Sequence, residues 1–356
     1  MMPTLKQPLL EAALLEAAPA AQRAQRRVWA IASCLSLLLA LSSLVCLLIK
    51  KELSLASVHE ADPASALASS DGLGKLIVRV DGVDEQLTVV ALSSTPSSLV
   101  SISGASLSLG HEPSATRGTR LWLAHDASLR PQSYAQFALL GRTLSYRIDL
   151  SAVGCSCNAA LYWVAMPGIG TDGTPERGAL GNYYCDANRV GGVWCWEVDT
   201  IEANVHAMQV APHSCSAPAG EHIDTCDRAG AAVNTHDVRP NGLCPSRECV
   251  IDSRRPFRHV QSFVADGAAR RLVAIVNVLE QGGRTFAFNG TSDAAYLEAM
   301  SGPLDRGLVL TFQLWGGPWR LMSWLDEKTR CSGDCSATAR VVYSDISIAR
   351  HDSILH

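Results

Sequence analysis

One short acidic stretch decides how the chain is interpreted, and it reads Glu197-Val198-Asp199-Thr200-Ile201-Glu202. Three acids fall within six residues, and Trp194, Cys195 and Trp196 come directly before them. An exposed charged face does not normally carry tryptophans, so the pattern predicts a polar site sunk in a cleft. Acidic and apolar residues alternate at the start of the stretch, which is typical of a β-strand.

The spacing of the acids predicts their geometry. Side chains alternate between the two faces of a strand, so Glu197 and Asp199 share a face. Glu202 lies an odd five positions from Glu197 and would point the other way in a regular strand. One β-bulge adds a single residue and returns Glu202 to the common face, and bulges occur beside active sites. We therefore expect Glu197 and Glu202 to flank a bound sugar, with Asp199 between them.

Carboxyl groups arranged in this way suit the hydrolysis of a bond between two sugars. One carboxylate attacks the sugar, and another carboxylic acid protonates the leaving oxygen. Acids this close resist simultaneous ionisation, so one of the three is expected to keep its proton at the working pH. An exposed acidic strand and a calcium-binding loop are the alternatives to a catalytic site.

From residue 76 onward, short β-rich segments dominate the chain, separated by Gly, Pro, Ser and Asp. They span residues 76–80, 87–90, 121–123, 144–150, 272–276, 308–312 and 341–343. Many short strands with turn signals predict an all-β sandwich or jelly roll. No strong amphipathic helix is predicted in this part. Residues 211–260 are rich in Cys, Pro and Arg and are expected to form a disulfide-braced loop region.

The composition predicts a folded protein that does not bind nucleic acid. Hydrophobic residues make up 47% of the 356 residues and charged residues 18%, which excludes wholesale disorder. The net charge is -4 and the isoelectric point is near 6.2, whereas a nucleic-acid partner needs a clustered basic surface.

The N-terminal region contains an apolar stretch that predicts a membrane anchor. Residues 28–49 carry no charge over 22 positions, which is long enough to span a bilayer. Arg23, Arg26 and Arg27 precede the span, and this charge favours a type II signal anchor with the rest of the chain lumenal or extracellular. Cleavage near residues 66–68 is the alternative and would give a secreted protein. The expected order is a cytoplasmic tail at 1–27, the anchor at 28–49, a stalk at 50–75 and the main domain at 76–356.

The cysteines support this topology. Cys34 and Cys46 lie in the span, and the other ten fall between residues 155 and 335, which predicts disulfides in an oxidising compartment. No pair of Cys-x-x-Cys knuckles occurs, so neither zinc nor another metal is expected. Asn289-Gly290-Thr291 is a glycosylation sequon that would be used on the lumenal side.

Further motifs surround the acids in a fixed order. They are Tyr184-Cys185-Asp186, Glu202-Ala203-Asn204, Ala211-Pro212-His213-Ser214-Cys215, the segment CSCNAALYWV at 155–164, and the segment LWGGPWRLMSWLD at 314–326. Together they resemble motifs of the family 7 glycoside hydrolases, the retaining cellobiohydrolases and endoglucanases, over roughly residues 100–350. The resemblance implies a concanavalin-like β-jelly-roll sandwich with disulfide-braced loops. The acids alone also suit family 16, which shares the jelly roll.

The resemblance also implies a role for each matching residue. Glu197 is expected to be the nucleophile, Glu202 the general acid/base, Asp199 the carboxyl that supports Glu197, and His213 a supporting neighbour of the acid. The expected substrate-binding positions are Asn158, Tyr162, Asn188, Arg239, Trp315, Trp319 and Trp324. No cofactor is implied.

Disulfide pairings follow from the same resemblance. The expected pairs are Cys185–Cys195, Cys215–Cys244, Cys226–Cys249, and Cys155 and Cys157 with Cys331 and Cys335.

The departures from the family point to an open cleft. No match is seen before residue 100, and residues 270–310 are shorter than the region that roofs the tunnel of processive members. The sequence therefore predicts a monomeric, retaining endo-β-1,4-glucanase acting on a β-glucan polysaccharide. Two alternatives stay open, a family 16-like hydrolase or transglycosylase of β-glucan or xyloglucan, and a non-catalytic glucan-binding wall protein.

Overall fold

The structure is a computed structural model, and it describes residues 72–113, 118–216, 221–267, 270–329 and 331–351. The predicted tail and anchor, residues 1–27 and 28–49, lie outside the described residues. Within the described residues, no helix is long and apolar enough to cross a bilayer. The first strand begins at Gly74, just inside the predicted stalk.

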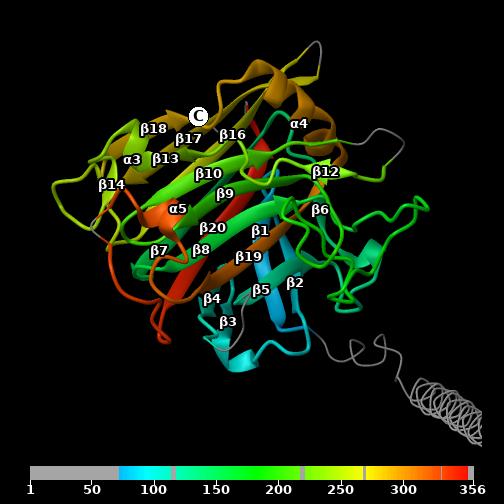
Figure 1. Ribbon diagram of the computed structural model, residues 1–356, viewed down its shortest axis with the longest axis horizontal. Helices are drawn as coiled ribbons and strands as arrows, with labels where there is room; N and C mark the ends of the chain where they lie inside the picture. Colours follow the sequence, from blue (N-terminus) through cyan, green and yellow to red (C-terminus); the bar gives the residue numbers. More distant parts are fainter. Residues whose placement is uncertain (1–71, 114–117, 217–220, 268–269, 330, 352–356) are drawn as a thin grey trace, which may run out of the picture. The chain divides into compact units, whose positions relative to one another are not determined.

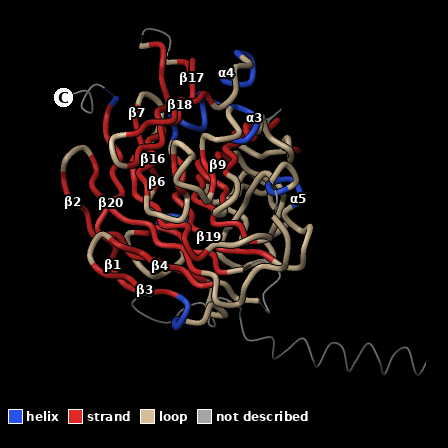
Figure 2. The backbone as a smooth tube through the Cα atoms, turned by 90° about the vertical axis from the view of Figure 1, so that its left-hand side faces the viewer, coloured by secondary structure: helices blue, strands red, loops and turns tan. Residues whose placement is uncertain are grey.

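Strands dominate the described chain (Figures 1 and 2). They are β1 (Gly74–Val80), β2 (Val83–Ala91), β3 (Val100–Ser103), β4 (Ser106–Gly110), β5 (Thr119–Ala124), β6 (Gln136–Phe137), β7 (Arg142–Ala152), β8 (Cys157–Val164), β9 (Glu197–Ala203), β10 (Met208–His213), β11 (Cys215–Ser216), β12 (Thr225–Cys226), β13 (Val233–Asn234), β14 (Leu243–Cys244), β15 (Ile251–Asp252), β16 (Phe257–Asp266), β17 (Arg271–Gln281), β18 (Arg284–Asn289), β19 (Leu308–Gly316) and β20 (Arg340–Arg350). The helices are η1 (Ser97–Leu99), η2 (Pro131–Ser133), α3 (Thr235–Val238), α4 (Ala294–Arg306) and α5 (Ser323–Asp326).

The strands form a β-sandwich. Hydrogen bonds connect 16 of them into one sheet. The main path runs β13-β10-β9-β8-β19-β5-β2-β1-β20-β7-β16-β17-β18, and β3, β4 and β6 pair with strands at its sides. The path folds back on itself, so β8, β9 and β19 overlie β20 and β7 (Figure 1). Phe312 of β19 and Tyr343 of β20 meet across the two layers, with ring centroids 5.4 Å apart. The expected all-β sandwich is therefore present.

Two hairpins show how local sequence sets strand register. Asp81 and Gly82 join β1 to β2 with φ angles of 48° and 85°, and Gly282 and Gly283 join β17 to β18 with φ angles of 57° and 77°. A two-residue turn with both central residues at positive φ is the type I′ turn, whose twist matches that of paired strands. Asp-Gly and Gly-Gly are sequences that adopt it readily.

Helix α4 was not expected from the sequence. It begins after Asp293, whose side chain accepts hydrogen bonds from the backbone N–H groups of Ala295 and Tyr296, and it ends at Gly307. Its apolar side chains include Leu297 and Leu304, which are buried against the core. The capping aspartate and the terminal glycine are recognisable start and stop signals, although the helix is short and its apolar stripe is interrupted.

Five disulfides join the ten cysteines of the main domain. Three pairs agree with expectation: Cys185–Cys195, Cys155–Cys331 and Cys157–Cys335. The last two tie the region around the start of β8 to the segment that follows α5.

The other two expected pairs, Cys215–Cys244 and Cys226–Cys249, are wrong. The structure contains Cys215–Cys226 and Cys244–Cys249 instead. Cys215 and Cys226 lie directly opposite each other in the β11–β12 ladder, so strand pairing brings their side chains together. Cys244 and Cys249 close a tight loop of sequence separation 5. Both bridges are therefore local and do not span the loop region.

Candidate active site

The bulge predicted between the acids is present in β9. Against β8, Leu161 pairs with Ile201 and Tyr162 pairs with Asp199, so Thr200 is an extra residue on β9. Against β10, the register also shifts between Asp199 and Glu202. The extra residue restores the side-chain face that an odd spacing would otherwise invert.

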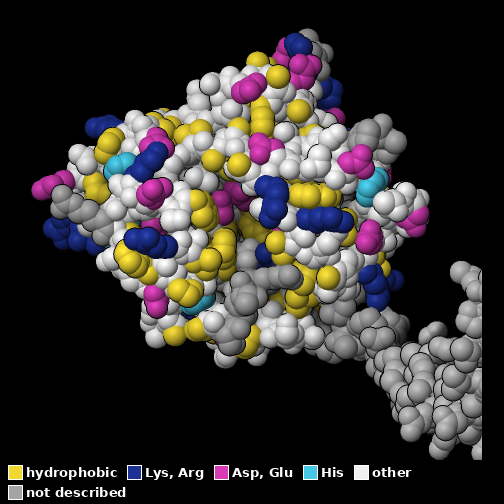
Figure 3. All heavy atoms as spheres, viewed as in Figure 1, with side chains coloured by type: hydrophobic (Ala, Val, Ile, Leu, Met, Phe, Trp, Pro, Cys, Tyr) yellow, Lys and Arg dark blue, Asp and Glu magenta, His cyan; other side chains and the backbone are white. Residues whose placement is uncertain are grey.

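Because of the bulge, Glu197, Asp199 and Glu202 line one cavity of about 630 Å³. The cavity lies over the strands that β9 pairs with, and His213 at the end of β10 also lines it. On the face shown in Figure 3, acidic side chains lie in a hollow with hydrophobic and basic side chains around it. The structure therefore brings together the four residues expected to form the catalytic group.

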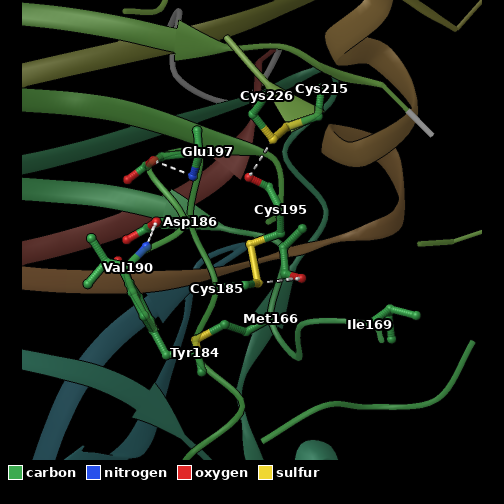
Figure 4. The surroundings of a disulfide bond; sticks show 12 residues. Met166, Ile169, Tyr184, Cys185, Asp186, Val190, Cys195, Glu197, Cys215 and Cys226 are labelled. Atoms are coloured by element: carbon green, nitrogen blue, oxygen red, sulfur yellow. Dashed lines mark hydrogen bonds between the residues drawn. A yellow bond between two sulfur atoms is a disulfide. The ribbon is translucent and has the colours of Figure 1, made fainter. Parts of the chain in front are cut away.

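Glu197 lies at the start of β9 and is held by the loop before it (Figure 4). The backbone N–H of Ala187 donates to Glu197 Oε2 at 2.9 Å, and the Cys185–Cys195 disulfide ties that loop to the strand. Burial and the neighbouring carboxyls of Asp199 and Asp186 raise the pKa of Glu197 well above its usual value, while the charge of His213 and the Ala187 N–H oppose the shift. The site thus offers this carboxylate one fixed donor and one nearby cation.

Glu202 lies at the other end of the acidic stretch in a different environment. Asn158 Nδ2 donates to Glu202 Oε1 at 2.8 Å. Burial and the charge of Asp199 raise the pKa of Glu202 to about 8. At neutral pH this carboxyl therefore keeps its proton, which is the state that a general acid needs.

Asp199 and His213 form an ion pair between the two glutamates. His213 Nε2 donates to Asp199 Oδ2 at 2.7 Å, and Nδ1 donates to the carbonyl oxygen of Asp227 at 2.9 Å. Burial lowers the pKa of His213, but the hydrogen bond to Asp199 and the nearby acids raise it to about 10. Gly230 lies so close that a Cβ there would approach His213 Cε1 at 2.7 Å. The imidazolium is therefore fixed in place as a cation beneath the acids.

The floor of the cavity contains residues that sequence reasoning did not assign. Arg120 of β5 donates from Nε to Gln313 Oε1 at 3.1 Å, and its guanidinium lies 4.2 Å from the ring centre of Tyr184. Burial works against the charge of Arg120, but Tyr162 and Tyr184, followed by Asp186 and Glu197, raise its pKa overall. Asp186 was visible in the Tyr-Cys-Asp motif, whereas nothing in the sequence around Arg120 marks it.

The expected substrate-binding residues divide into three groups. Those that line the cavity are Tyr162, Asn188, Trp315 and Trp324. Asn158 is fully buried and reaches Glu202 from below without lining the cavity. Arg239 and Trp319 lie outside it. Arg239 is an exposed residue that ends α3, and Trp319 is 52% exposed with the Arg320 guanidinium 4.6 Å from its ring centre.

Two tryptophans that drew attention to the acidic stretch do not belong to the catalytic cavity. Trp194 and Trp196 line a separate hollow, together with residues of the segment 165–175 and the end of α4. Trp196 is almost completely buried in the main core. The tryptophans next to the acids in the sequence therefore do not mark the catalytic cavity, which is lined instead by Trp315 and Trp324 from a distant segment. The sequon residue Asn289 ends β18 and is exposed.

The arrangement allows one kind of chemistry above others. It presents two glutamates on one face of a strand, both with pKa values raised by burial and by neighbouring acids, and one of them, Glu197, accepts a backbone N–H. Between them lies a carboxylate paired with a cationic histidine. Two carboxyls on one face that hold fewer than two charges between them are the pair that general-acid and nucleophilic catalysis at an acetal uses.

Comparison with known proteins agrees with the geometry. Residues 93–190 match the model of glycosyl hydrolase family 7. Endoglucanase EG-1 of Trichoderma longibrachiatum is 31% identical over 278 residues, which cover 67% of this chain and 56% of the relative. The match thus spans little more than half the length of this curated relative.

Solved structures show the same fold. An endoglucanase I complexed with cellobiose has a TM-score of 0.63 at 20% identity, over 80% of this chain and 98% of that protein. A family 7 cellobiohydrolase from Daphnia pulex has a TM-score of 0.64 at 17% identity, over 81% of this chain and 99% of that protein. The chain is therefore similar in sequence to glycosyl hydrolase family 7 and to its endoglucanases, and it shares its fold with the two solved enzymes.

Proposed function

We propose that the chain is a retaining endo-β-1,4-glucanase that cuts cellulose-like polysaccharides. One observation carries the proposal: the bulge in β9 places Glu197 and Glu202 in one cavity with different hydrogen-bond donors and a cationic His213 nearby. The endoglucanase names of the curated relatives support the substrate class.

The reaction would proceed in two displacements. Glu202 donates its proton to the glycosidic oxygen while Glu197 attacks the anomeric carbon and forms a glycosyl-enzyme. Glu202, now ionised, takes a proton from water, which attacks the same carbon and releases Glu197. In this scheme Asp199 and His213 hold Glu197 in position and set the charge around it. Trp315 and Trp324 present apolar ring faces to the C–H faces of the sugar.

The location of the enzyme is proposed from the sequence and the cysteines together. Five disulfides within residues 155–335 suit an oxidising compartment. A catalytic unit on the lumenal or extracellular side, anchored through residues 28–49, is consistent with this pattern.

An activity screen of the full chain, folded under oxidising conditions, tests the proposal. Carboxymethyl cellulose, barley β-glucan, laminarin and xyloglucan are the substrates. We expect the viscosity of carboxymethyl cellulose to fall faster than reducing ends appear, as internal cutting requires. We also expect NMR to show a β-anomer as the first product. Preference for laminarin or xyloglucan would indicate the family 16-like activity, and binding without reducing-end release would indicate a non-catalytic protein.

A further inference from the structure

A buried polar contact crosses the core directly behind the acids. Thr200, the extra residue of the bulge, points away from the cavity toward the opposite sheet. Trp163 Nε1 donates to Thr200 Oγ1 at 3.0 Å, and Thr200 Oγ1 donates to Gln261 Oε1 at 2.7 Å. Trp163 and Thr200 have no exposed surface and Gln261 has 1%. The hydroxyl thus joins β8 and β9 in one layer to β16 in the other.

The opposite sheet continues this contact as a chain of hydrogen bonds. Gln261 Nε2 donates to Asn277 Oδ1 at 3.0 Å, and His259 Nε2 lies 3.0 Å from the same oxygen. Because that oxygen only accepts, His259 carries its proton on Nε2 and accepts from Tyr146 OH on Nδ1 at 2.8 Å. Burial lowers the pKa of His259 to about 4, so the ring is neutral and this donor pattern is kept at neutral pH.

Strand register explains why these groups meet. His259 and Gln261 are two residues apart on β16, so they share its inner face. Gln261 pairs with Asn277 of β17, and His259 pairs with Tyr146 of β7. Three neighbouring strands therefore present one polar cluster to the core, and Thr200 is the point at which β9 contacts it.

Packing alone does not explain a threonine at this position. Thr200 and the next residue, Ile201, are both fully buried, and an apolar β-branched side chain would satisfy the inward pattern equally well. A buried hydroxyl costs free energy unless it is hydrogen-bonded, whereas a satisfied network specifies a unique arrangement. The two hydrogen bonds of Thr200 satisfy its hydroxyl and connect the extra residue of β9 to the opposite sheet.

We propose that Thr200 is a positioning residue: its hydroxyl, held between Trp163 and Gln261, fixes the bulge of β9 and thereby the separation of the Glu197 and Glu202 carboxyls. Without the bulge, Glu202 faces the core, and a displaced bulge changes the distance between the two acids. Both changes reduce the rate of the chemical step more than they reduce binding, because the proposed sugar contacts Trp315 and Trp324 lie on β19 and α5 and not on β9. The kinetic form of this inference rests on the proposed glucanase function.

The experiment compares Thr200→Val, Thr200→Ser and Gln261→Met in the full chain on carboxymethyl cellulose. We expect kcat of Thr200→Val to fall roughly 10-fold to 100-fold, as small misplacements of catalytic groups do, with KM within about twofold of wild type. Thr200→Ser keeps the hydroxyl and restores most of kcat. The double variant Thr200→Val/Gln261→Met loses no more than the worse single variant, because both remove one shared hydrogen bond.

Thr311→Val is the matched control. Thr311 is also a fully buried β-strand threonine, but its hydroxyl has no hydrogen-bond partner among the described residues. Its kcat should equal that of wild type. A similar fall in Thr311→Val, a kcat of folded Thr200→Val within twofold of wild type, or additive losses in the double variant would each overturn the proposal. If Thr200→Val does not fold, Gln261→Met alone decides the outcome by the same split between kcat and KM.

A readout independent of activity separates this inference from the proposed function. We expect amide hydrogens of residues 198–203 to exchange at least about tenfold faster in folded Thr200→Val than in wild type, because the bulge loses its anchor. Unchanged exchange overturns the inference even when the enzyme is active. A wild type that cleaves no glucan overturns the proposed function, and the exchange measurement still decides the role of Thr200.

Discussion

The two faces of β9 differ in what they demand from the fold. The cleft face presents three acids, two of which have raised pKa values because burial and like charge disfavour ionisation. The core face presents Val198, Thr200, Ile201 and Ala203, all fully or almost fully buried between the sheets. On this one strand, the cleft face therefore lowers the free energy of unfolding and the core face raises it.

The acidic face of β9 is not stable by itself and depends on the rest of the strand. Clustered carboxyls repel one another, and removing one of them normally stabilises a protein at neutral pH. The opposite face must therefore supply the packing that keeps the strand in place. Substitutions of the acids should therefore cost activity, and substitutions of the apolar side chains on the core face should cost stability, with Thr200 the one core-face residue expected to affect activity.

The largest effect is expected on the cleft face, from Glu197→Gln. The amide keeps the shape of the side chain but cannot attack the anomeric carbon, so kcat on carboxymethyl cellulose should fall on the order of a thousandfold or more. The melting temperature should stay equal to or above that of wild type, because a buried acid is removed. Activity that survives in this variant would remove Glu197 from the mechanism.

Glu202→Gln should give the next largest effect, and it depends on the leaving group. We expect a loss of roughly 10²-fold to 10⁴-fold on glucans, the usual contribution of a general acid. On aryl cellobiosides the first displacement should be nearly unaffected, because a phenolate leaves without a proton. An equal loss on both substrates would assign Glu202 a different role.

The same variant tests the pKa of Glu202. In wild type this carboxyl titrates near its ordinary 4.5 when unfolded and at about 8 when folded. The folded state binds the extra proton between these values, so wild-type stability falls as the pH rises through that window. His213, raised from 6.5 to about 10, extends the fall to higher pH. The melting temperature of Glu202→Gln should therefore exceed that of wild type by an amount that grows from pH 4.5 to 8. A constant difference across this range would contradict the raised pKa.

The geometry of the acidic strand could be predicted from the sequence because it depends only on the spacing of neighbouring residues. Alternation fixes which side chains share a face, so the odd spacing of Glu197 and Glu202 required a bulge, and the bulge is found at Thr200. The motifs of the family supplied His213 and the cleft tryptophans Trp315 and Trp324 at positions that line the cavity.

The features that could not be predicted from the sequence depend on contacts between segments that are distant in the chain. Arg120 reaches the cavity because β5 pairs with β19, which places it beside Gln313. No sequence pattern around Arg120 predicts this pairing. The pairing of Cys215 with Cys226 follows from the β11–β12 ladder, whose two-residue strands carry no recognisable strand signal. Arg239 matched a family motif, yet the path of its loop leaves it outside the cavity.

A smaller effect is expected at the rim of the cleft, from Trp324→Ala. Trp324 lines the cavity, and losing a ring that stacks on a sugar costs about 1 kcal/mol, which corresponds to a KM roughly fivefold higher. Trp319→Ala is the matched control, because Trp319 belongs to the same segment but lies outside the cavity. Equal changes in KM for the two variants would show that the substrate also contacts Trp319.

The smallest effect is expected on the core face, from Ile201→Val, and it isolates stability from chemistry. Ile201 is fully buried and belongs to the main core. The substitution removes one methylene and should lower the free energy of unfolding by about 1 kcal/mol. Valine is also β-branched, so the strand and its bulge are kept and kcat should equal that of wild type. Denaturant unfolding and steady-state kinetics measure the two quantities on one preparation. If kcat falls together with stability, apolar packing on the core face also sets the separation of the acids, and the hydrogen bonds of Thr200 are not the only contacts on that face that do so.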